Sequence, residues 1–411
     1  MFNLLMNWMR DNKILPQISD TERQALEAGD VWIDGQFFGG KVDFEKILAE
    51  NYDQLPEHEQ AYIDGPVEEL LKRADAYTLS RTRKLPDELF TFMAENGFFG
   101  MQIAKEYGGN PMSTQAKSCI MAKVSSHSGL LSAMVVIPNS LGAAELLGHY
   151  GTDEQKQYYL PKLATGEMIG AIAMTEPGAG SDLQGVKTTA VKNASGDHYV
   201  LNGSKTFITN GQLADLVIVV AKTDPKEGAK GTSLLLVETA WEGFEKGQNL
   251  NKVGMKAQDT SELFFQDVQV PADKLLGSME GQGFFQLMAE LPAERLQVGL
   301  TAVAAAEAAW EWTLDYVKER KAFGKPVIAF QNTRFKMAEM KAEITAARVF
   351  CDRCLELHLE KKLDIPTAAM LKQHTTDLQC KVMDECVQLH GGYGYMWEYP
   401  IARAWADSRV Q

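Results

Sequence analysis

Glu294 is the residue whose type and setting most favour acid–base chemistry. It lies in the hexapeptide Leu291–Leu296, near the start of a segment, 283–317, whose apolar residues recur with helical spacing. Apolar neighbours would desolvate the Glu294 carboxylate and raise its pKa, which suits a general base. Arg295 points about 100° away around such a helix, so it need not neutralise Glu294. For the hexapeptide alone, the alternative is a solvated Glu–Arg pair on a helix surface.

A second candidate for chemistry is the loop from Met174 to Asp182, which follows a predicted strand. Its glycines, Gly178 and Gly180, would let backbone amides approach a ligand closely. Such amides suit a pyrophosphate or the edge of a flavin. The alternative is a tight turn between two strands.

Two further segments place glycine beside polar residues at helix ends. The three cations of 320–326 either complement a helix macrodipole or bind a phosphate from another subunit. The Gly-rich segment 388–394 either caps a helix or brings the backbone close to a ligand. His390 within it has an ordinary capping role available.

Composition narrows the class of protein. The 411 residues are 45% hydrophobic and 23% charged, as in soluble globular proteins, and are enough for two or three domains. The net charge of −14 argues against a nucleic-acid-binding protein, which would usually carry a basic stripe. No apolar run is long enough to span a membrane. The segment 1–15 could form an amphipathic helix that docks on the body, on a partner or on a membrane surface.

The five cysteines suit a reducing compartment, since they are sparse and odd in number. Cys351 and Cys354 have CxxC spacing, which a metal or redox site could use. They lie in a predicted helix without glycine or proline to form a metal knuckle, and Cys380 and Cys386 are spaced wrongly for zinc. We expect helix-packing thiols and no metal site.

The hydrophobic pattern divides the chain into a helical part, a β part and a second helical part. Helices are predicted at 86–99, at 113–150 (two helices with a break near 138–140), and at about 283–318, 329–361 and 365–389. Strands are predicted at 169–173, 198–201, 216–221, 232–237 and 261–270, with turns at 193–197, 202–203, 210–211 and 224–231.

We therefore expect an α+β multidomain fold. It comprises an N-terminal extension (1–60), an α-helical domain (61–167), a β-barrel or sandwich domain (168–275) and a C-terminal helical bundle (276–411). The order of helices, strands and helices excludes a Rossmann-type alternation.

Taken together in this order, these segments resemble the acyl-CoA dehydrogenase family, from about residue 80 to the end. The resemblance is carried by 104–109, 175–182, 201–211, 319–324 with Gln331, and 388–400. It implies the family's fold of an α-helical domain, a β domain and a four-helix bundle, in agreement with the pattern above.

The resemblance also implies an FAD-dependent enzyme that oxidises an acyl-CoA thioester to trans-2-enoyl-CoA. A carboxylate removes the α-proton while the β-hydrogen leaves as hydride to the flavin, and hydrogen-bond donors stabilise the enolate oxygen. An electron-transfer flavoprotein is the implied electron acceptor. By motif, the implied FAD contacts are Met174, Thr175, Gly180, Ser181, Phe207, Ile208, Thr209, Arg320, Phe323, Gln331, Gln388, Gly391 and Gly392. The implied substrate contacts are Ser181 and Arg295.

Part of this set would serve a neighbouring subunit. Arg320, Phe323 and Gln331 look like contacts to the neighbour's FAD, as does the group Gln388, Gly391 and Gly392, which implies a homodimer or homotetramer. Phe207 stands where tryptophan is common in the family; phenylalanine keeps the stacking face and loses the indole donor.

Members of the family place their base in one of two positions. Glu294 matches the long-chain and isovaleryl types, with Glu290 and Glu398 as rival carboxylates. Other members use a glutamate in a turn beyond a segment like 403–411. Because the sequence stops at Gln411, before that turn and the last helix, we expect a truncation or a shortened relative. The segment 18–29 looks like the large bacterial fatty-acid-oxidation acyl-CoA dehydrogenases.

Three functions stay open on the sequence. The first is dehydrogenation of a medium- to long-chain acyl-CoA in fatty-acid β-oxidation, in the bacterial cytoplasm. The second is an acyl-CoA oxidase-type flavoenzyme that passes electrons to oxygen. The third is a non-catalytic protein that binds acyl-CoA or flavin, which would follow from the missing turn.

Overall fold

A computed structural model describes residues 54–140 and 142–411. The interpretations of 1–15 and 18–29 therefore lie outside the described residues. Within the described residues, eight α-helices precede the first strand: α5 (Glu57–Tyr62), α6 (Glu68–Arg73), α7 (Ala76–Thr82), α8 (Asp87–Glu95), α9 (Thr114–His127), α10 (Gly129–Val136), α11 (Ala143–Tyr150) and α12 (Asp153–Thr165).

The region 113–150 contains three α-helices where two were predicted. The predicted break near 138–140 is confirmed by a 3₁₀ turn at Ile137–Asn139. The second break falls at Ser128, which has an extended backbone and accepts a hydrogen bond from the N–H of Leu131. Ser128 thereby ends α9 and caps α10. Serine favours this N-cap position, and the spacing of apolar residues gives no sign of it.

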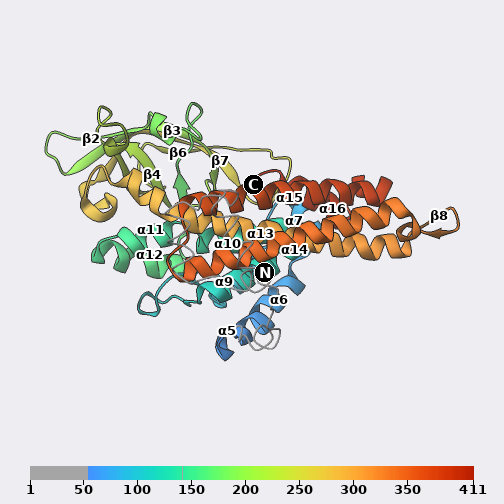
Figure 1. Cartoon of the computed structure of the whole chain (residues 1–411). Coiled ribbons are helices and arrows are strands. Elements are labelled where there is room, and N and C mark those ends of the chain that lie inside the picture. Colours follow the sequence, from blue (N-terminus) through green and yellow to red (C-terminus); the bar gives the residue numbers. More distant parts are fainter. Residues whose placement is uncertain (1–53, 141) are drawn as a thin grey trace, which may run out of the picture. The chain divides into compact units, whose positions relative to one another are not determined.

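Seven strands form the middle of the chain: β1 (Gly170–Ala173), β2 (Thr189–Lys192), β3 (His198–Thr209), β4 (Leu216–Lys222), β5 (Thr232–Glu238), β6 (Phe244–Asn249) and β7 (Thr260–Pro271). Their order is β1-β4-β2-β3-β7-β6, with β5 paired to β4. β1 lies parallel to β4, whereas β3 pairs antiparallel with β7. The sheet lies at one end of the described part of the chain (Figure 1).

The turn predicted at 202–203 is wrong, because β3 runs through it. The register between β3 and β7 shifts at this point, which marks a bulge. Gly203 has a φ of +151° there, and a Cβ at this position would come within 2.4 Å of the Thr188 hydroxyl. The glycine therefore serves a close approach of two chain segments within a continuous strand.

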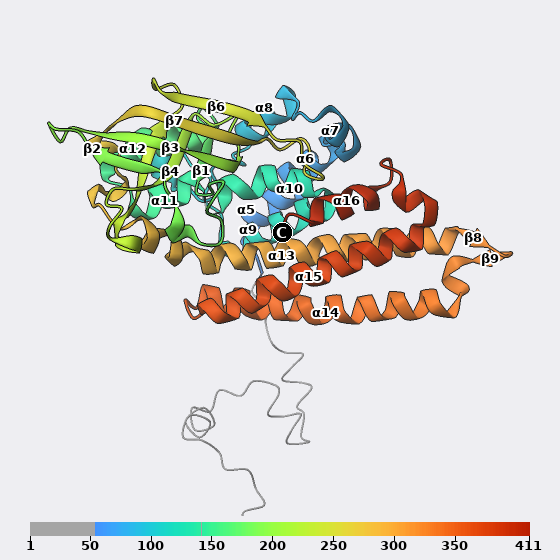
Figure 2. The same ribbon diagram turned by 90° about the horizontal axis from the view of Figure 1, so that it is seen from above.

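Three C-terminal helices agree closely with the predicted ranges: α13 (Gly283–Glu319), α14 (Gln331–Leu359) and α15 (Ile365–His390). The short α16 (Pro400–Ser408) was not predicted. A hairpin of β8 (Lys321–Ala322) and β9 (Lys325–Pro326) joins α13 to α14. The helices α13, α14 and α15 run side by side (Figure 2), and their shared core contains Cys351, Cys354 and Cys386 as buried side chains. The thiols thus pack within the bundle.

One helical stretch within the described residues, Gly129–Tyr150, is long and apolar enough to cross a bilayer. Its mean hydropathy is 1.6, and 71% of it is buried inside the protein. The same combination occurs in core helices of proteins that cross no membrane, so the stretch is weak evidence for a span.

Candidate active site

Glu294 lies on α13, the longest helix, where its side chain is partly buried. The helix places Glu290 one turn earlier on nearly the same face. Glu294 also lies close enough to Glu145 of α11 for the two carboxylates to repel each other. The surroundings of Glu294 therefore include other acids, in addition to the apolar neighbours that the sequence indicated.

The rival carboxylate Glu290 is occupied by two hydrogen-bonding partners. Its Oε1 lies 2.9 Å from His149 Nδ1 and accepts a hydrogen bond of 2.7 Å from the Tyr150 hydroxyl. Burial raises the pKa of Glu290, but these hydrogen bonds outweigh burial and lower it below its usual value. A carboxylate held in its charged form in this way is a poor proton acceptor.

The other rival, Glu398, lies in the turn before α16 and is exposed. Its backbone carbonyl accepts a hydrogen bond from Arg403, 2.9 Å away. This is a structural contact of the turn.

A second group of candidate residues meets where the loop after β1 contacts the end of β3. The N–H of Thr206 donates to the Thr175 carbonyl at 2.9 Å, and Lys205 Nζ donates to the Met174 carbonyl at 3.0 Å. The loop that carries Gly180 and Ser181 is thus fixed beside the segment 207–209. Both Gly180 and Ser181 are exposed, and a Cβ on Gly180 would meet no atom within 4 Å. This open space suits the approach of a ligand.

Phe207 presents its ring at this junction. Its side chain is 65% exposed, and its φ of +58° is unusual for a residue with a side chain. The register between β3 and β7 shifts between Lys205 and Ile208, which turns Phe207 outward while Ile208 is buried in the sheet's core. Only the backbone of Ile208 is available to a ligand, whereas Phe207 offers an aromatic face, as flavin stacking requires.

A third group lies at the opposite end of α13, in a pocket of about 450 Å³. Its lining includes four of the candidate residues, Arg320, Gln388, Gly391 and Gly392. A cation, an amide and two glycines with open space above them suit a phosphate-bearing ligand. His390 also lines the pocket, stacked on Tyr316 at 4.3 Å with its Nδ1 2.8 Å from the Cys386 carbonyl.

The hairpin beside this pocket carries Phe323, whose side chain is 95% exposed at a φ of +51°. Its ring lies 6.2 Å from that of Phe330, which immediately precedes Gln331, also exposed. An aromatic side chain exposed to this degree at a hairpin tip is a common feature of a contact surface.

The structure therefore assembles the candidate residues into separate groups. The stretch of α13 from Glu294 to Glu319 alone spans about 38 Å at a rise of about 1.5 Å per residue. The sheet and the β8–β9 hairpin, which follows Arg320, lie at opposite ends of the described part of the chain (Figure 1).

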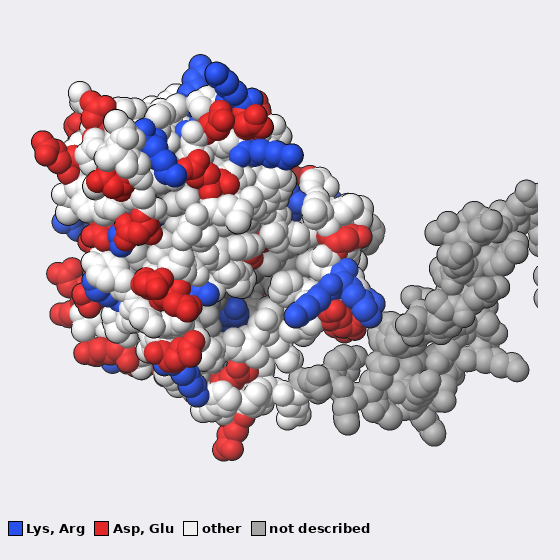
Figure 3. Space-filling view, turned by 90° about the vertical axis from the view of Figure 1, so that its left-hand side faces the viewer, with Lys and Arg blue, Asp and Glu red and all other residues white. Residues whose placement is uncertain are grey.

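On the face shown in Figure 3, acidic and basic side chains are interspersed around a central area of uncharged residues. A binding site on this face would therefore depend on shape and local hydrogen bonds more than on a broad electrostatic field.

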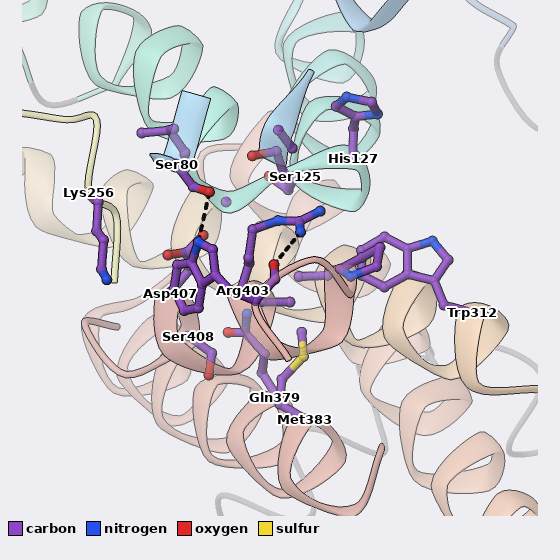
Figure 4. A pocket seen from close by; sticks show the side chains of 18 residues that line it. Ser80, Ser125, His127, Lys256, Trp312, Gln379, Met383, Arg403, Asp407 and Ser408 are labelled. Carbon is purple, nitrogen blue, oxygen red and sulfur yellow. Dashed lines mark hydrogen bonds between the residues drawn. The ribbon is translucent and has the colours of Figure 1, made fainter. Parts of the chain in front are cut away.

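Another pocket lies where α16 packs against α7, α9 and α15 (Figure 4). Hydrogen bonds tie its rim together, from Trp397 to Ser80 at 3.0 Å and from Arg403 to the Trp397 carbonyl at 2.7 Å. Asp407 accepts from the N–H of Met255 at 2.6 Å. None of the candidate residues lines this pocket, and its contacts hold α16 in place.

Sequence reasoning missed two features of the site. One is the buried Lys205–Glu176 ion pair, and the other is the Glu145–His149 pair beside Glu290. The four-residue spacing of Glu145 and His149 gives a weak signal, since it places both on one face of a helix. No sequence signal indicates that this face contacts α13.

Models of a known protein family match most of the chain. Residues 61–167, 171–268 and 281–411 match the models described as acyl-CoA dehydrogenase N-terminal, middle and C-terminal domain. The long-chain specific acyl-CoA dehydrogenase, mitochondrial, of Mus musculus is 50% identical over 336 residues, 79% of this chain and 75% of that protein. A short-chain specific acyl-CoA dehydrogenase of Clostridium acetobutylicum is 37% identical over 338 residues, 82% of this chain and 87% of that protein. The acyl-CoA dehydrogenase structure from Geobacillus kaustophilus has a TM-score of 0.81 at 43% identity, covering 88% of this chain and 94% of that one.

Proposed function

Because the chain belongs to the acyl-CoA dehydrogenase family, we propose that it dehydrogenates a medium- to long-chain acyl-CoA to trans-2-enoyl-CoA in fatty-acid β-oxidation. Family membership makes the chain a flavin-dependent oxidoreductase that uses FAD. The preference for longer chains is supported by the 50% identity with a long-chain specific relative. The short-chain specific relative, at 37% identity, makes chain length a matter for measurement.

Glu294 is the proposed catalytic base. It removes the α-proton of the thioester, while Arg295 and Ser181 bind the substrate. The observation that carries this assignment is the state of Glu290, whose carboxylate is engaged by His149 and Tyr150. Glu294 lies one helical turn further along α13, where Glu145 repels its charged form and so favours uptake of a proton.

FAD, when bound, accepts the β-hydrogen as hydride. The proposed cofactor contacts of the chain form two groups, one at the end of β3 and one in the Arg320 pocket. Phe207 offers an aromatic face, and the loop of Met174, Thr175, Gly180 and Ser181 offers backbone and hydroxyl groups beside it. The backbone of Ile208 and the side chain of Thr209 complete this first group of contacts.

The pocket lined by Arg320, Gln388, Gly391 and Gly392 is proposed to hold the phosphate-bearing part of the FAD of a second copy. Phe323 and Gln331 would contact the same cofactor. The separation of this pocket from the β3 group within one chain supports a homodimer or homotetramer in which two chains complete each site. A site built across two chains requires assembly before FAD is fully held.

Several finer assignments follow from the resemblance. An electron-transfer flavoprotein is the proposed electron acceptor, and the bacterial cytoplasm is the proposed location. The proposed domains are a helical domain (61–167), a β domain (168–275) and a helical bundle (276–411).

An anaerobic titration with palmitoyl-CoA tests this function. The flavin absorbance near the visible maximum should bleach with palmitoyl-CoA at lower concentration than with butyryl-CoA. Flavin that stays oxidised with both thioesters would contradict the catalytic proposal and favour a binding protein. Oxygen consumption without an added acceptor would favour the oxidase alternative.

A further inference from the structure

Glu145 and His149 of α11 form a compact polar group with Glu290 of α13. One donor or acceptor atom of each residue lies within 4.8 Å of those of the other two. Glu145 and His149 share one face of α11, and Glu290 and Glu294 share one face of α13. The proposed base lies one turn from Glu290 and interacts electrostatically with Glu145, so it is next to a group that links two helices.

The charges that face Glu145 come from three helices. Glu290 and Glu294 on α13 are acids, whereas His149 on α11 and Lys117 on α9 are bases. Burial, then Glu290 and Glu294, together raise the pKa of Glu145 to about 7, against the opposing effects of His149 and Lys117. Glu145 can therefore change its charge near neutral pH, at a position where Glu294 senses the change.

We propose that Glu145 is a positioning residue for the base, because its charge sets how strongly Glu294 holds the α-proton. This inference rests on the proposed role of Glu294. Glu145 itself would touch neither substrate nor cofactor. It would act through the electrostatic interaction between the two carboxylates.

The proton step has a defined direction in this account. The substrate's α C–H bond breaks, its electron pair stays on the substrate, and an O–H bond forms on Glu294; the β-hydrogen then leaves as hydride to FAD. A charged Glu145 repels the charged form of Glu294 and so favours the proton-bound form, which makes Glu294 a stronger base. A neutral Glu145 does not repel the charged form of Glu294, so Glu294 is then a weaker base. The rate of the step should consequently rise with pH as Glu145 ionises.

Replacing His149 provides a way to change the pH at which Glu145 ionises. It faces solvent on one side, with 57% of its side chain exposed, and contacts Glu290 on the other. Its pKa is raised, first by its hydrogen bond to Glu290. Its interaction with Glu145 lowers the pKa of that carboxyl, so removing His149 should raise the pKa of Glu145 and shift its ionisation to higher pH.

The test is the pH dependence of flavin reduction in the FAD-loaded protein, mixed anaerobically with saturating palmitoyl-CoA. Glu145→Gln should lower the high-pH plateau roughly threefold and abolish the rise that follows the ionisation of Glu145, since a tenfold change in basicity alters a proton-transfer rate by about its square root. His149→Gln should move the midpoint to higher pH. Glu145→Asp, which keeps the charge, should retain most of the plateau.

A transition lost in Glu145→Gln and shifted to higher pH in His149→Gln is a pair of effects that loss of structure does not give. Glu167→Gln, which changes an exposed carboxylate elsewhere in the same region, should superimpose on the parent profile. If Glu145→Gln does not fold, the shift in His149→Gln decides. A transition retained in Glu145→Gln, or an unchanged midpoint in His149→Gln, would overturn the role of Glu145 provided that Glu294→Gln remains unreduced. Normal reduction of Glu294→Gln would instead overturn the proposed base itself.

Discussion

Lys205 and Glu176 form an ion pair of 2.8 Å inside the β domain, and both side chains are almost completely removed from solvent. Glu176 also accepts hydrogen bonds from the N–H groups of Lys187 and Thr188, at 2.7 and 3.0 Å. The pair therefore ties the loop after β1 to β3 from within. It holds Met174 and Thr175 beside the strand that ends in Phe207.

Replacing Glu176 by glutamine should be costly, because Lys205 would stay buried without its counter-ion. We expect the free energy of unfolding to fall by about 3–5 kcal/mol and bound FAD to be lost more readily. Urea unfolding and the FAD content after gel filtration measure the two effects. Glu356→Gln, which breaks the exposed ion pair with Arg353, should cost less than about 1 kcal/mol. Equal effects of the two changes would contradict the role given to the buried pair.

The same pair predicts the sign of a pH dependence. Burial raises the pKa of Glu176, but the hydrogen bonds from Lys205 and Thr188 bring it below its usual 4.5. A carboxylate with a lowered pKa stabilises the fold above its usual pKa, and this contribution is lost as the pH falls through the folded value. The stability difference between the parent and Glu176→Gln should therefore shrink as the pH falls below about 4.5. A difference that grows on acidification would contradict this assignment.

Phe207 should affect cofactor binding and apoprotein stability in opposite directions. Its φ of +58° is strained for phenylalanine and unstrained for glycine. Phe207→Gly should leave the apoprotein as stable as the parent or up to about 1 kcal/mol more stable. It should weaken FAD binding at least about tenfold, since a base-stacking aromatic face is lost. Phe207→Trp should retain FAD, and equal affinity in Phe207→Gly would exclude stacking.

The proposed two-chain site predicts that two inactive variants complement each other. Arg320→Met removes a cation from the pocket that serves the neighbour's FAD, whereas Glu294→Gln removes the base from the chain's own site. In a mixed dimer, one site regains both Glu294 and Arg320. Co-expression should therefore restore activity in one of the two sites of each mixed dimer. Each variant expressed alone should stay inactive, and no recovery in isolated mixed dimers would contradict shared sites.

The buried thiols should be inert. Burial raises the pKa of Cys351 and of Cys386 to about 12, so neither forms thiolate near neutral pH. Iodoacetamide should modify the exposed Cys119 in the native protein and reach Cys351, Cys354 and Cys386 only after denaturation. Mass spectrometry of the peptides gives the result. Rapid native labelling of Cys351 would show that the bundle core opens.

The long elements could be predicted because their patterns are strong. The range 283–318 differs from α13 by one residue at its end, and the buried run of β4 stands out between turns. The strands β2 and β6 could not be found, because they are short and their residues are mostly polar or partly exposed. Gly203 resembled a turn residue, and only the contact with Thr188 reveals why glycine is needed inside a strand.

Part of the site could be predicted from the sequence for a similar reason. Motifs indicate Glu294, Phe207 and the Arg320 pocket because their own neighbours in sequence carry the signal. Glu145 and His149, which belong to the charged surroundings of Glu294, come from α11. Only the packing of α11 against α13 brings them to the base. Such a contact depends on tertiary structure and leaves no trace in local spacing.

The most direct test of the central claim compares Glu294→Gln with Glu290→Gln, each purified with FAD and mixed anaerobically with palmitoyl-CoA. Glutamine matches the shape of glutamate and cannot accept the α-proton. We expect Glu294→Gln to bind FAD as the parent does and to remain oxidised, with at least a thousandfold slower reduction, while Glu290→Gln is still reduced. Reduction of Glu294→Gln at the parent rate would show that another group removes the proton.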